Sequence, residues 1–235
     1  MSLLSIITDA CYRTNQTPPP AAFSSSDPNI QQMVSLLQDI GDELSERYFW
    51  RNLNFGGQVT GDGTTTQFTI PGDFGQMSPG MTITSSLYPL LPLRGPIDNE
   101  DLARLKALPA WPVRPVWRFI GGALEFFPAP ANGEVMTFNY YSTNWILLAD
   151  ATTRTARWTA DTDTGLVDEK VLTRGLIWRW LSVKGLEYAE EFRRYEMALD
   201  RAVGRDDTTR MVTMSRGVNI VDDQWFPGII TYSGP

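Results

Sequence analysis

The sequence predicts an α+β fold in which a helical bundle carries an inserted β domain and an extended C-terminal arm. Apolar residues recur at spacings of three and four toward both ends of the chain, which is typical of amphipathic helices. The middle of the chain instead carries short β-branched and aromatic runs between glycine and proline turns. The expected parts are N-terminal helices (1–54), a β domain (55–145), a connecting loop with a long C-terminal helix (146–203) and an arm (204–235).

Two helices are expected before the β domain. The first covers about residues 2–13, and a linker rich in proline and serine follows it. Asp27 before Pro28 is a start signal for the second, because aspartate caps free N–H groups and proline is tolerated in the first helical turn. The apolar residues that follow at helical spacing are Ile30, Met33, Leu37, Ile40, Leu44 and Tyr48.

The β domain is expected to be a small sandwich or barrel of five or six strands, interrupted by a short helix near 98–107. The clearest strand runs are 67–70, 81–84, 116–120, 124–127 and 135–141. The Gly121-Gly122 pair predicts a tight hairpin. Gly61-Asp62-Gly63-Thr64 is also expected to be a hairpin turn, because neither a Lys-Ser/Thr pair nor a helix follows it to form a phosphate loop.

From Asp168 the helical spacing returns, and one helix is expected to run to about residue 203. At 1.5 Å per residue it would be about 50 Å long, too long for a domain of this size to bury completely. Part of its apolar stripe is therefore expected to contact another helix or another subunit. The residues assigned to a ring interface on this stripe are Trp178, Leu181, Tyr188, Phe192 and Tyr195.

The arm, residues 204–235, is irregular in pattern but too rich in aromatic and β-branched residues for a solvated tail. It is expected either to dock on a partner or to fold back on its own bundle. Strand addition and an aromatic anchor would suit docking. The residues expected to make that contact are Val218, Ile220, Val221, Trp225, Phe226, Ile229, Ile230 and Tyr232.

The composition excludes several classes of function. The chain has no histidine, which excludes Ser-His-Asp, Cys-His and His-zinc chemistry, and its single cysteine, Cys11, is expected to be a small buried hydrophobe. No metal or other cofactor is expected. A net charge of −7 disfavours tight nucleic-acid binding. No apolar run approaches the ~18 residues of a membrane span, and the N-terminus lacks a secretory pattern, so we expect no membrane contact and no export.

Carboxylates offer the remaining chemistry. The densest cluster, Asp161, Asp163, Asp168 and Glu169, fails the spacing of a calcium loop and is expected to form a capping turn at the start of the C-terminal helix. A glycosidase pair drawn from Asp150, Asp161, Glu125 and Glu134 stays open. A carbohydrate-binding or carboxylate-based hydrolase module is therefore the alternative function, and a generic oligomeric scaffold is a further one.

Several segments resemble a known family in their order and spacing. They are 124–133 (LEFFPAPANG), 138–145 (FNYYSTNW), 158–163 (WTADTD), 168–169 (DE), 176–180 (LIWRW) and 184–195 (KGLEYAEEFRRY). The two N-terminal helices ending in 48–50 (YFW), followed by a strand-like run closing on 71–74 (PGDF), are similar too. The family is that of the head-to-tail adaptor proteins of tailed bacteriophages, also called connectors or tail accessory factors, especially those of short-tailed phages.

The resemblance implies a structural virion protein without enzymatic activity. It implies a ring, dodecameric in such proteins, that joins the portal to tail or nozzle proteins in the neck or tail of the virion. The protein would be made in the host cytoplasm, and its arm would reach into the portal. DNA would pass through the channel without specific binding, which a negative net charge suits.

Overall fold

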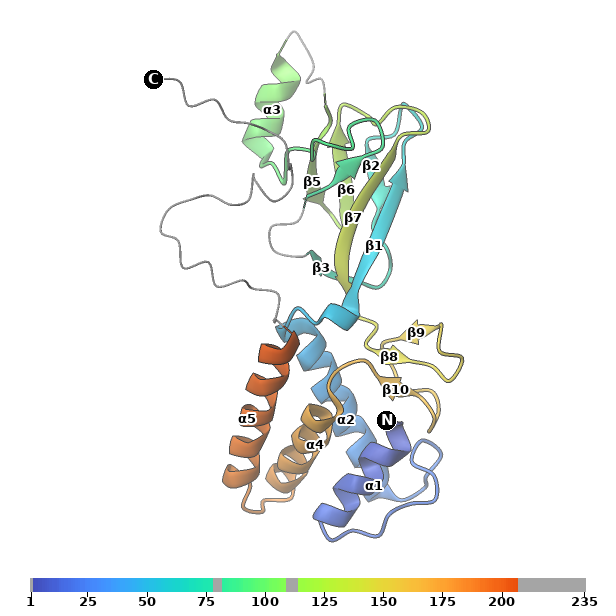
Figure 1. Ribbon diagram of the computed structural model, residues 1–235, viewed down its shortest axis with the longest axis vertical. Helices are drawn as coiled ribbons and strands as arrows, with labels where there is room; N and C mark the ends of the chain where they lie inside the picture. Colours follow the sequence, from blue (N-terminus) through green and yellow to red (C-terminus); the bar gives the residue numbers. More distant parts are fainter. Residues whose placement is uncertain (1, 78–81, 109–113, 207–235) are drawn as a thin grey trace.

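The computed structural model describes residues 2–77, 82–108 and 114–206, which contain five α-helices and three antiparallel sheets. All the docking residues expected in the arm lie outside this part of the chain. Figure 1 shows a helical lobe at one end of the molecule and a β lobe at the other. None of the helices in the described segments is long and apolar enough to cross a membrane.

The two N-terminal helices begin where the sequence predicts. α1 (Leu3–Arg13) is capped by Ser2, whose side chain accepts a bond from a backbone N–H in the first turn. α2 (Pro28–Arg47) is capped by Asp27, whose carboxylate accepts from a backbone N–H at 2.9 Å. Both caps satisfy N–H groups that have no partner inside the helix. The predicted apolar face of α2 is buried in the helical lobe.

The prediction of a single long helix over 168–203 is wrong. The segment forms two helices, α4 (Glu169–Val183) and α5 (Ala189–Asp206), which pack against each other as a hairpin (Figure 1). Gly185 has a φ of +69°, in the left-handed region that favours glycine. Its N–H donates to the carbonyl of Ser182 at 3.1 Å, which is part of a Schellman motif that ends α4. The apolar stripe therefore folds onto itself, and its length no longer implies a second subunit.

Helices from both ends of the chain share one hydrophobic core, in which α4 contacts α1, α2 and α5. Trp145, which follows the β lobe in sequence, is fully buried in this core. A Cβ on Gly41 of α2 would clash with the Trp145 ring, so only glycine fits there. The Trp145 indole N–H donates to the Asp42 carboxylate at 2.8 Å, and its ring meets Trp158 edge to face at 5.2 Å. Cys11 is also buried, as expected.

Two sheets build the β lobe. The first has the order β1-β7-β3, and β4 also pairs with β7; its strands are β1 (Asn54–Thr60), β3 (Phe74–Met77), β4 (Thr84–Ser85) and β7 (Val135–Ser142). The second has the order β2-β6-β5; its strands are β2 (Gln67–Thr69), β5 (Val116–Ile120) and β6 (Ala123–Phe127). Residues from both sheets form a common core; they include Val59, Trp117, Leu124, Phe126, Met136 and Phe138.

Three further elements complete the described chain. The expected short helix is α3 (Asn99–Ala107), capped by Asp98. A third small sheet has the order β10-β8-β9 and lies beside the helical lobe (Figure 1); its strands are β8 (Ile146–Leu147), β9 (Arg154–Thr155) and β10 (Thr164–Gly165). A 3-10 turn, Arg51–Leu53, connects α2 to β1.

One of the two glycine turns is a hairpin and the other is not. Gly121 and Gly122 have φ of +55° and +78° and close the β5–β6 hairpin, as predicted. The hairpin expected at 61–64 is wrong, because β1 pairs with β7 whereas β2 pairs with β6. The Asp62 carboxylate accepts from the N–H groups of the next two threonines at 2.8 and 2.6 Å and bends the chain from one sheet to the other.

Candidate functional site

The residues assigned from sequence to an interface meet on the α4–α5 hairpin. Trp178 of α4 is the centre of this aromatic group, because three rings next to or on α5 surround it. Its ring lies 5.1 Å from Phe192 in an edge-on contact, 5.9 Å from Tyr195 and 6.4 Å from Tyr188, measured between centroids. The group thus first serves to hold the two helices of the hairpin together.

The five residues assigned to the interface differ in their burial. Tyr195 is only 4% exposed and belongs to the core, and this burial, with the charge of Glu43, raises the pKa of its hydroxyl to about 12. Trp178 and Leu181 are half-buried against the same core. Tyr188 and Phe192 remain 44% and 40% exposed. Only the outer edges of those two rings are therefore available to a partner.

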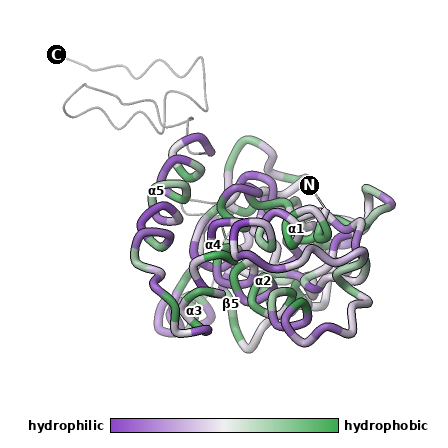
Figure 2. Tube along the Cα trace, turned by 90° about the horizontal axis from the view of Figure 1, so that it is seen from below, coloured by the Kyte–Doolittle hydropathy of each residue, from purple (hydrophilic) through white to green (hydrophobic). Residues whose placement is uncertain are grey.

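Two further exposed apolar residues, which sequence reasoning missed, flank the hairpin turn. Val183 is 53% and Leu186 54% exposed. Together with Tyr188 and Phe192 they form what we call the hairpin patch, all within residues 183–192. Single exposed apolar residues are normal on a protein surface, whereas several close together in one segment make that segment a candidate contact surface. Figure 2 shows α5 at the edge of the helical lobe, with hydrophobic and hydrophilic residues alternating along it.

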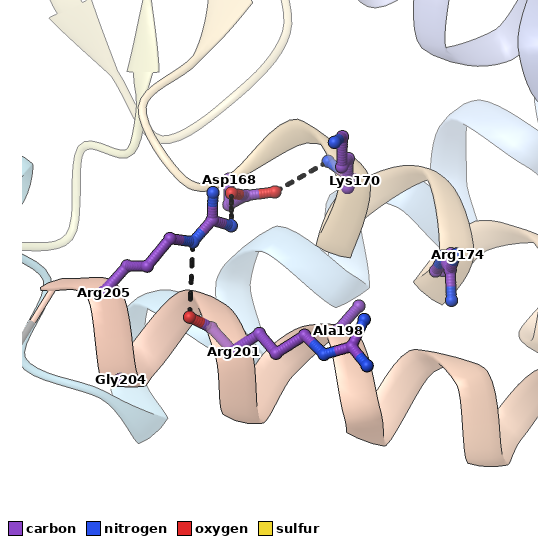
Figure 3. Close-up of a pocket in the computed structure, with 7 residues that line it drawn as sticks. All are labelled: Asp168, Lys170, Arg174, Ala198, Arg201, Gly204 and Arg205. Carbon is purple, nitrogen blue, oxygen red and sulfur yellow. Dashed lines mark hydrogen bonds and ion pairs between the residues drawn. The ribbon is translucent and has the colours of Figure 1, made fainter.

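A groove of about 490 Å³ lies between α4 and α5 (Figure 3). Four of the residues that line it are cationic: Lys170, Arg174, Arg201 and Arg205. The Arg205 guanidinium pairs with the Asp168 carboxylate at 2.8 Å and also donates to the carbonyl of Arg201 at 3.3 Å. Because cations dominate this lining, the chemistry of the groove is that of an anion-binding surface.

The carboxylate cluster near α4 holds loops together, and only part of it forms the expected cap. Asp168 caps α4, accepting from the Lys170 N–H at 2.9 Å. The Asp161 carboxylate instead accepts from the N–H groups of Ala22 and Phe23 at 2.9 and 2.7 Å. The capping turn expected from the whole cluster is therefore wrong for Asp161, which fixes the linker between α1 and α2.

Asp163 connects a loop before α4 to the start of α1. Its carboxylate accepts from the N–H groups of Thr159 and Ala160 at 2.7 and 2.8 Å, which closes a tight loop. Its backbone carbonyl accepts from the Leu3 N–H at 2.9 Å, at the N-terminus of α1. The cluster joins segments that are far apart in sequence. Within the described segments, no group of three potential ligand side chains is placed to hold a metal ion.

The other members of the proposed glycosidase pair also make structural bonds. Glu125 is buried and pairs with Arg118 at 2.5 Å. Glu134 accepts from the Ser85 hydroxyl and from the Ala131 N–H. Hydrogen bonds, chiefly from the Thr153 side chain, lower the pKa of Asp150 to about 2. These carboxylates are bonded into the fold, so the geometry gives no support to a hydrolase.

Comparison with known proteins identifies the family. A family model described as SU10 adaptor protein matches residues 1–220, which cover both lobes and the hairpin. No curated protein matches the sequence. The family consists of structural bacteriophage proteins that are typically non-enzymatic and whose place is the virion neck. The resemblance to head-to-tail adaptors is thereby confirmed, and the chain belongs to the SU10 adaptor protein family.

Proposed function

We propose that the protein assembles as a ring that joins the portal to the tail and surrounds the DNA exit channel. Family membership supports this proposal, and the hairpin patch adds a structural observation to it. Its four apolar side chains are partly exposed to solvent, as a surface that binds another protein would be. Portal and tail or nozzle proteins are its expected partners. A net charge of −7 suits a channel through which DNA passes without specific binding.

The hairpin patch is suited to a subunit contact because its residues are fixed before assembly. Tyr188 and Phe192 already lean on Trp178, so a partner orders few new side chains when it covers them. Burying the exposed half of each patch residue contributes roughly 1 kcal/mol per side chain. Contacts of this size are weak singly and become strong when they repeat around a closed ring.

Charges in the hairpin patch should disrupt assembly while leaving the fold intact. We expect Tyr188→Asp and Phe192→Asp to reduce incorporation into portal-bound rings by at least about tenfold, because the charge loses water when a partner covers it. The loss of free energy of unfolding should stay near 1 kcal/mol, the worth of one aromatic contact. Sedimentation with portal rings of the same phage measures incorporation, and thermal melting measures stability.

Two further variants on α5 serve as controls for this experiment. Met197→Asp is a matched control, because Met197 is 46% exposed on α5 but lies outside the hairpin patch. It should assemble like wild type. Tyr195→Asp places the charge in the core and should prevent folding. Incorporation of Tyr188→Asp and Phe192→Asp at wild-type levels would remove the hairpin patch from the assembly surface.

The arm expected over 204–235 starts too early, because residues 204–206 belong to α5. Residues 207–235 are proposed as the portal-docking arm, and a truncation tests that role. The chain should be cut after Asp206, because Arg205 pairs with Asp168 and the Asp206 carboxylate accepts from the Arg51 N–H at 2.8 Å. We expect the truncated protein to keep its melting temperature and to lose most of its affinity for portal rings. The opposite result, a lower melting temperature with unchanged affinity, would mean that the arm stabilises its own helical lobe.

A further inference from the structure

Three cations on one face of the helical lobe have no carboxylate partner in the described part of the chain. Lys170 and Arg201 are exposed, and Arg174 donates only to the backbone carbonyl of Arg194, at 3.0 Å. Arg174 lines three adjoining grooves of about 490, 330 and 540 Å³, which run between α1, α4 and α5. We call the surface around Lys170, Arg174 and Arg201 the basic face.

Four acids line the grooves of the basic face; three of them pair with arginines, and the fourth is Glu169 in the first turn of α4. Asp9 pairs with Arg13 at 3.1 Å, Asp168 with Arg205 at 2.8 Å and Glu191 with Arg194 at 2.6 Å; these acids and Arg13 and Arg194 line the same grooves. Six cationic and four acidic residues line these grooves, so Lys170, Arg174 and Arg201 leave the surface with an excess of positive charge. An excess of positive charge is unexpected on a protein whose net charge is −7.

A row of acidic residues along α2 carries an excess of negative charge. Asp39, Glu43 and Glu46 are spaced by four and three residues, which places them on one side of the helix. Glu43 pairs with Arg179 of α4 and lies 3.8 Å from Arg47. Asp39 and Glu46 are exposed, and neither forms an ion pair within the described segments. We call these three residues the acidic stripe.

The basic face and the acidic stripe lie on different sides of the helical lobe. Arg174 and Arg179 are five residues apart on α4, so their side chains diverge by about 140° around the helix. Arg174 faces the grooves between α1, α4 and α5, whereas Arg179 reaches the acidic stripe. In Figure 1, α2 accordingly runs behind α4. One protomer thus presents complementary charges on two separate faces, as a head-to-tail ring contact requires.

We infer that the basic face of one copy binds the acidic stripe on α2 of the next copy in the ring. This inference rests on the proposed ring and names the surfaces that build it. Each charge pair at such a contact adds little by itself, but the pairing fixes which faces meet and speeds their encounter. DNA is a less suitable ligand, because three unpaired cations among four acids neutralise few phosphates.

Charge reversal tests the inference. One variant carries Lys170→Glu and Arg174→Glu, a second carries Asp39→Lys and Glu46→Lys, and a third carries all four changes. We expect each double variant to need at least about tenfold more protein for half-maximal ring assembly on portal rings, because like charges then face each other. The fourfold variant should return to within about threefold of wild type. Assembly of wild type should also weaken as salt rises.

A matched control separates local pairing from net charge. Arg157→Glu with Arg193→Glu makes the same change in net charge as Lys170→Glu with Arg174→Glu, at two exposed arginines outside both surfaces, and it should assemble like wild type. Melting temperatures of all variants should stay close to that of wild type, because every altered residue is at the surface or borders a groove. Binding of a labelled DNA duplex is measured in parallel and should be negligible for every variant.

The outcomes that overturn the inference are distinct. Wild-type assembly by both double variants, or a fourfold variant no better than the doubles, would show that these faces do not meet. A basic-face variant that loses duplex binding and keeps assembly would assign that face to DNA. If the wild-type protein forms no rings on portals, the proposed function is wrong as well. If rings form and tolerate the charge reversals, only the inference about these two surfaces is wrong.

Discussion

Replacing Trp145 with alanine should lower the free energy of unfolding by about 3–5 kcal/mol. The side chain is fully buried, lies against Gly41 of α2 and packs edge to face on Trp158. Its removal leaves a cavity in the core of the helical lobe and leaves the Asp42 carboxylate without the indole N–H bond at 2.8 Å. Urea unfolding followed by tryptophan fluorescence and circular dichroism measures the loss.

Tyr12→Ala is the matched control for this prediction. Tyr12 is an aromatic residue of the same lobe but is 69% exposed, so its truncation should cost well under 1 kcal/mol. A Trp145→Ala protein that unfolds at the same urea concentration as the control would mean that Trp145 does not hold the helical lobe together.

The second large effect is expected in the β lobe. Arg118→Leu should lower the free energy of unfolding by about 3 kcal/mol, because it leaves the buried Glu125 carboxylate without its main cation. Lys106, at 3.5 Å from the same carboxylate, is half exposed and replaces only part of the lost interaction. Thermal melting in neutral buffer measures the loss.

Removing both charges distinguishes an unpaired carboxylate from lost packing. The double variant Arg118→Leu with Glu125→Leu should recover most of the stability, because no buried charge remains. A double variant as unstable as Arg118→Leu alone would show that the arginine acts through packing. The same pair bears on the hydrolase alternative, since a carboxylate fixed by an arginine at 2.5 Å is poorly placed to act as a general acid.

Local signals explain what the sequence predicted correctly. Ser2 and Asp27 start helices with their own side chains, and the Gly121-Gly122 turn closes a hairpin between neighbouring strands. The turn at 61–64 was mispredicted because the partners of β1 and β2 are β7 and β6, and turn composition does not specify pairing with such distant strands.

The long-helix prediction failed because apolar spacing alone does not show where a helix ends. Residues on both sides of the turn face the same core, so the spacing of three and four persists across it. Lys184-Gly185 was the available stop signal, since glycine just after a helix favours a Schellman motif. Apolar spacing alone also does not show which residues of the hairpin stay exposed. The pattern found the apolar residues, but exposure, which separates Phe192 from Tyr195, depends on tertiary packing.

Electron microscopy of the purified protein mixed with portal rings of the same phage can show directly whether the protein assembles as a ring on the portal. We expect an added ring of density at one end of the portal, with the helical lobes side by side around an open channel. Averaged side views of portal alone and of the mixture supply the comparison. The proposed ring would be wrong if the portal rings stayed unchanged at saturating concentrations of folded adaptor, or if the adaptor bound as separate copies without lateral contact.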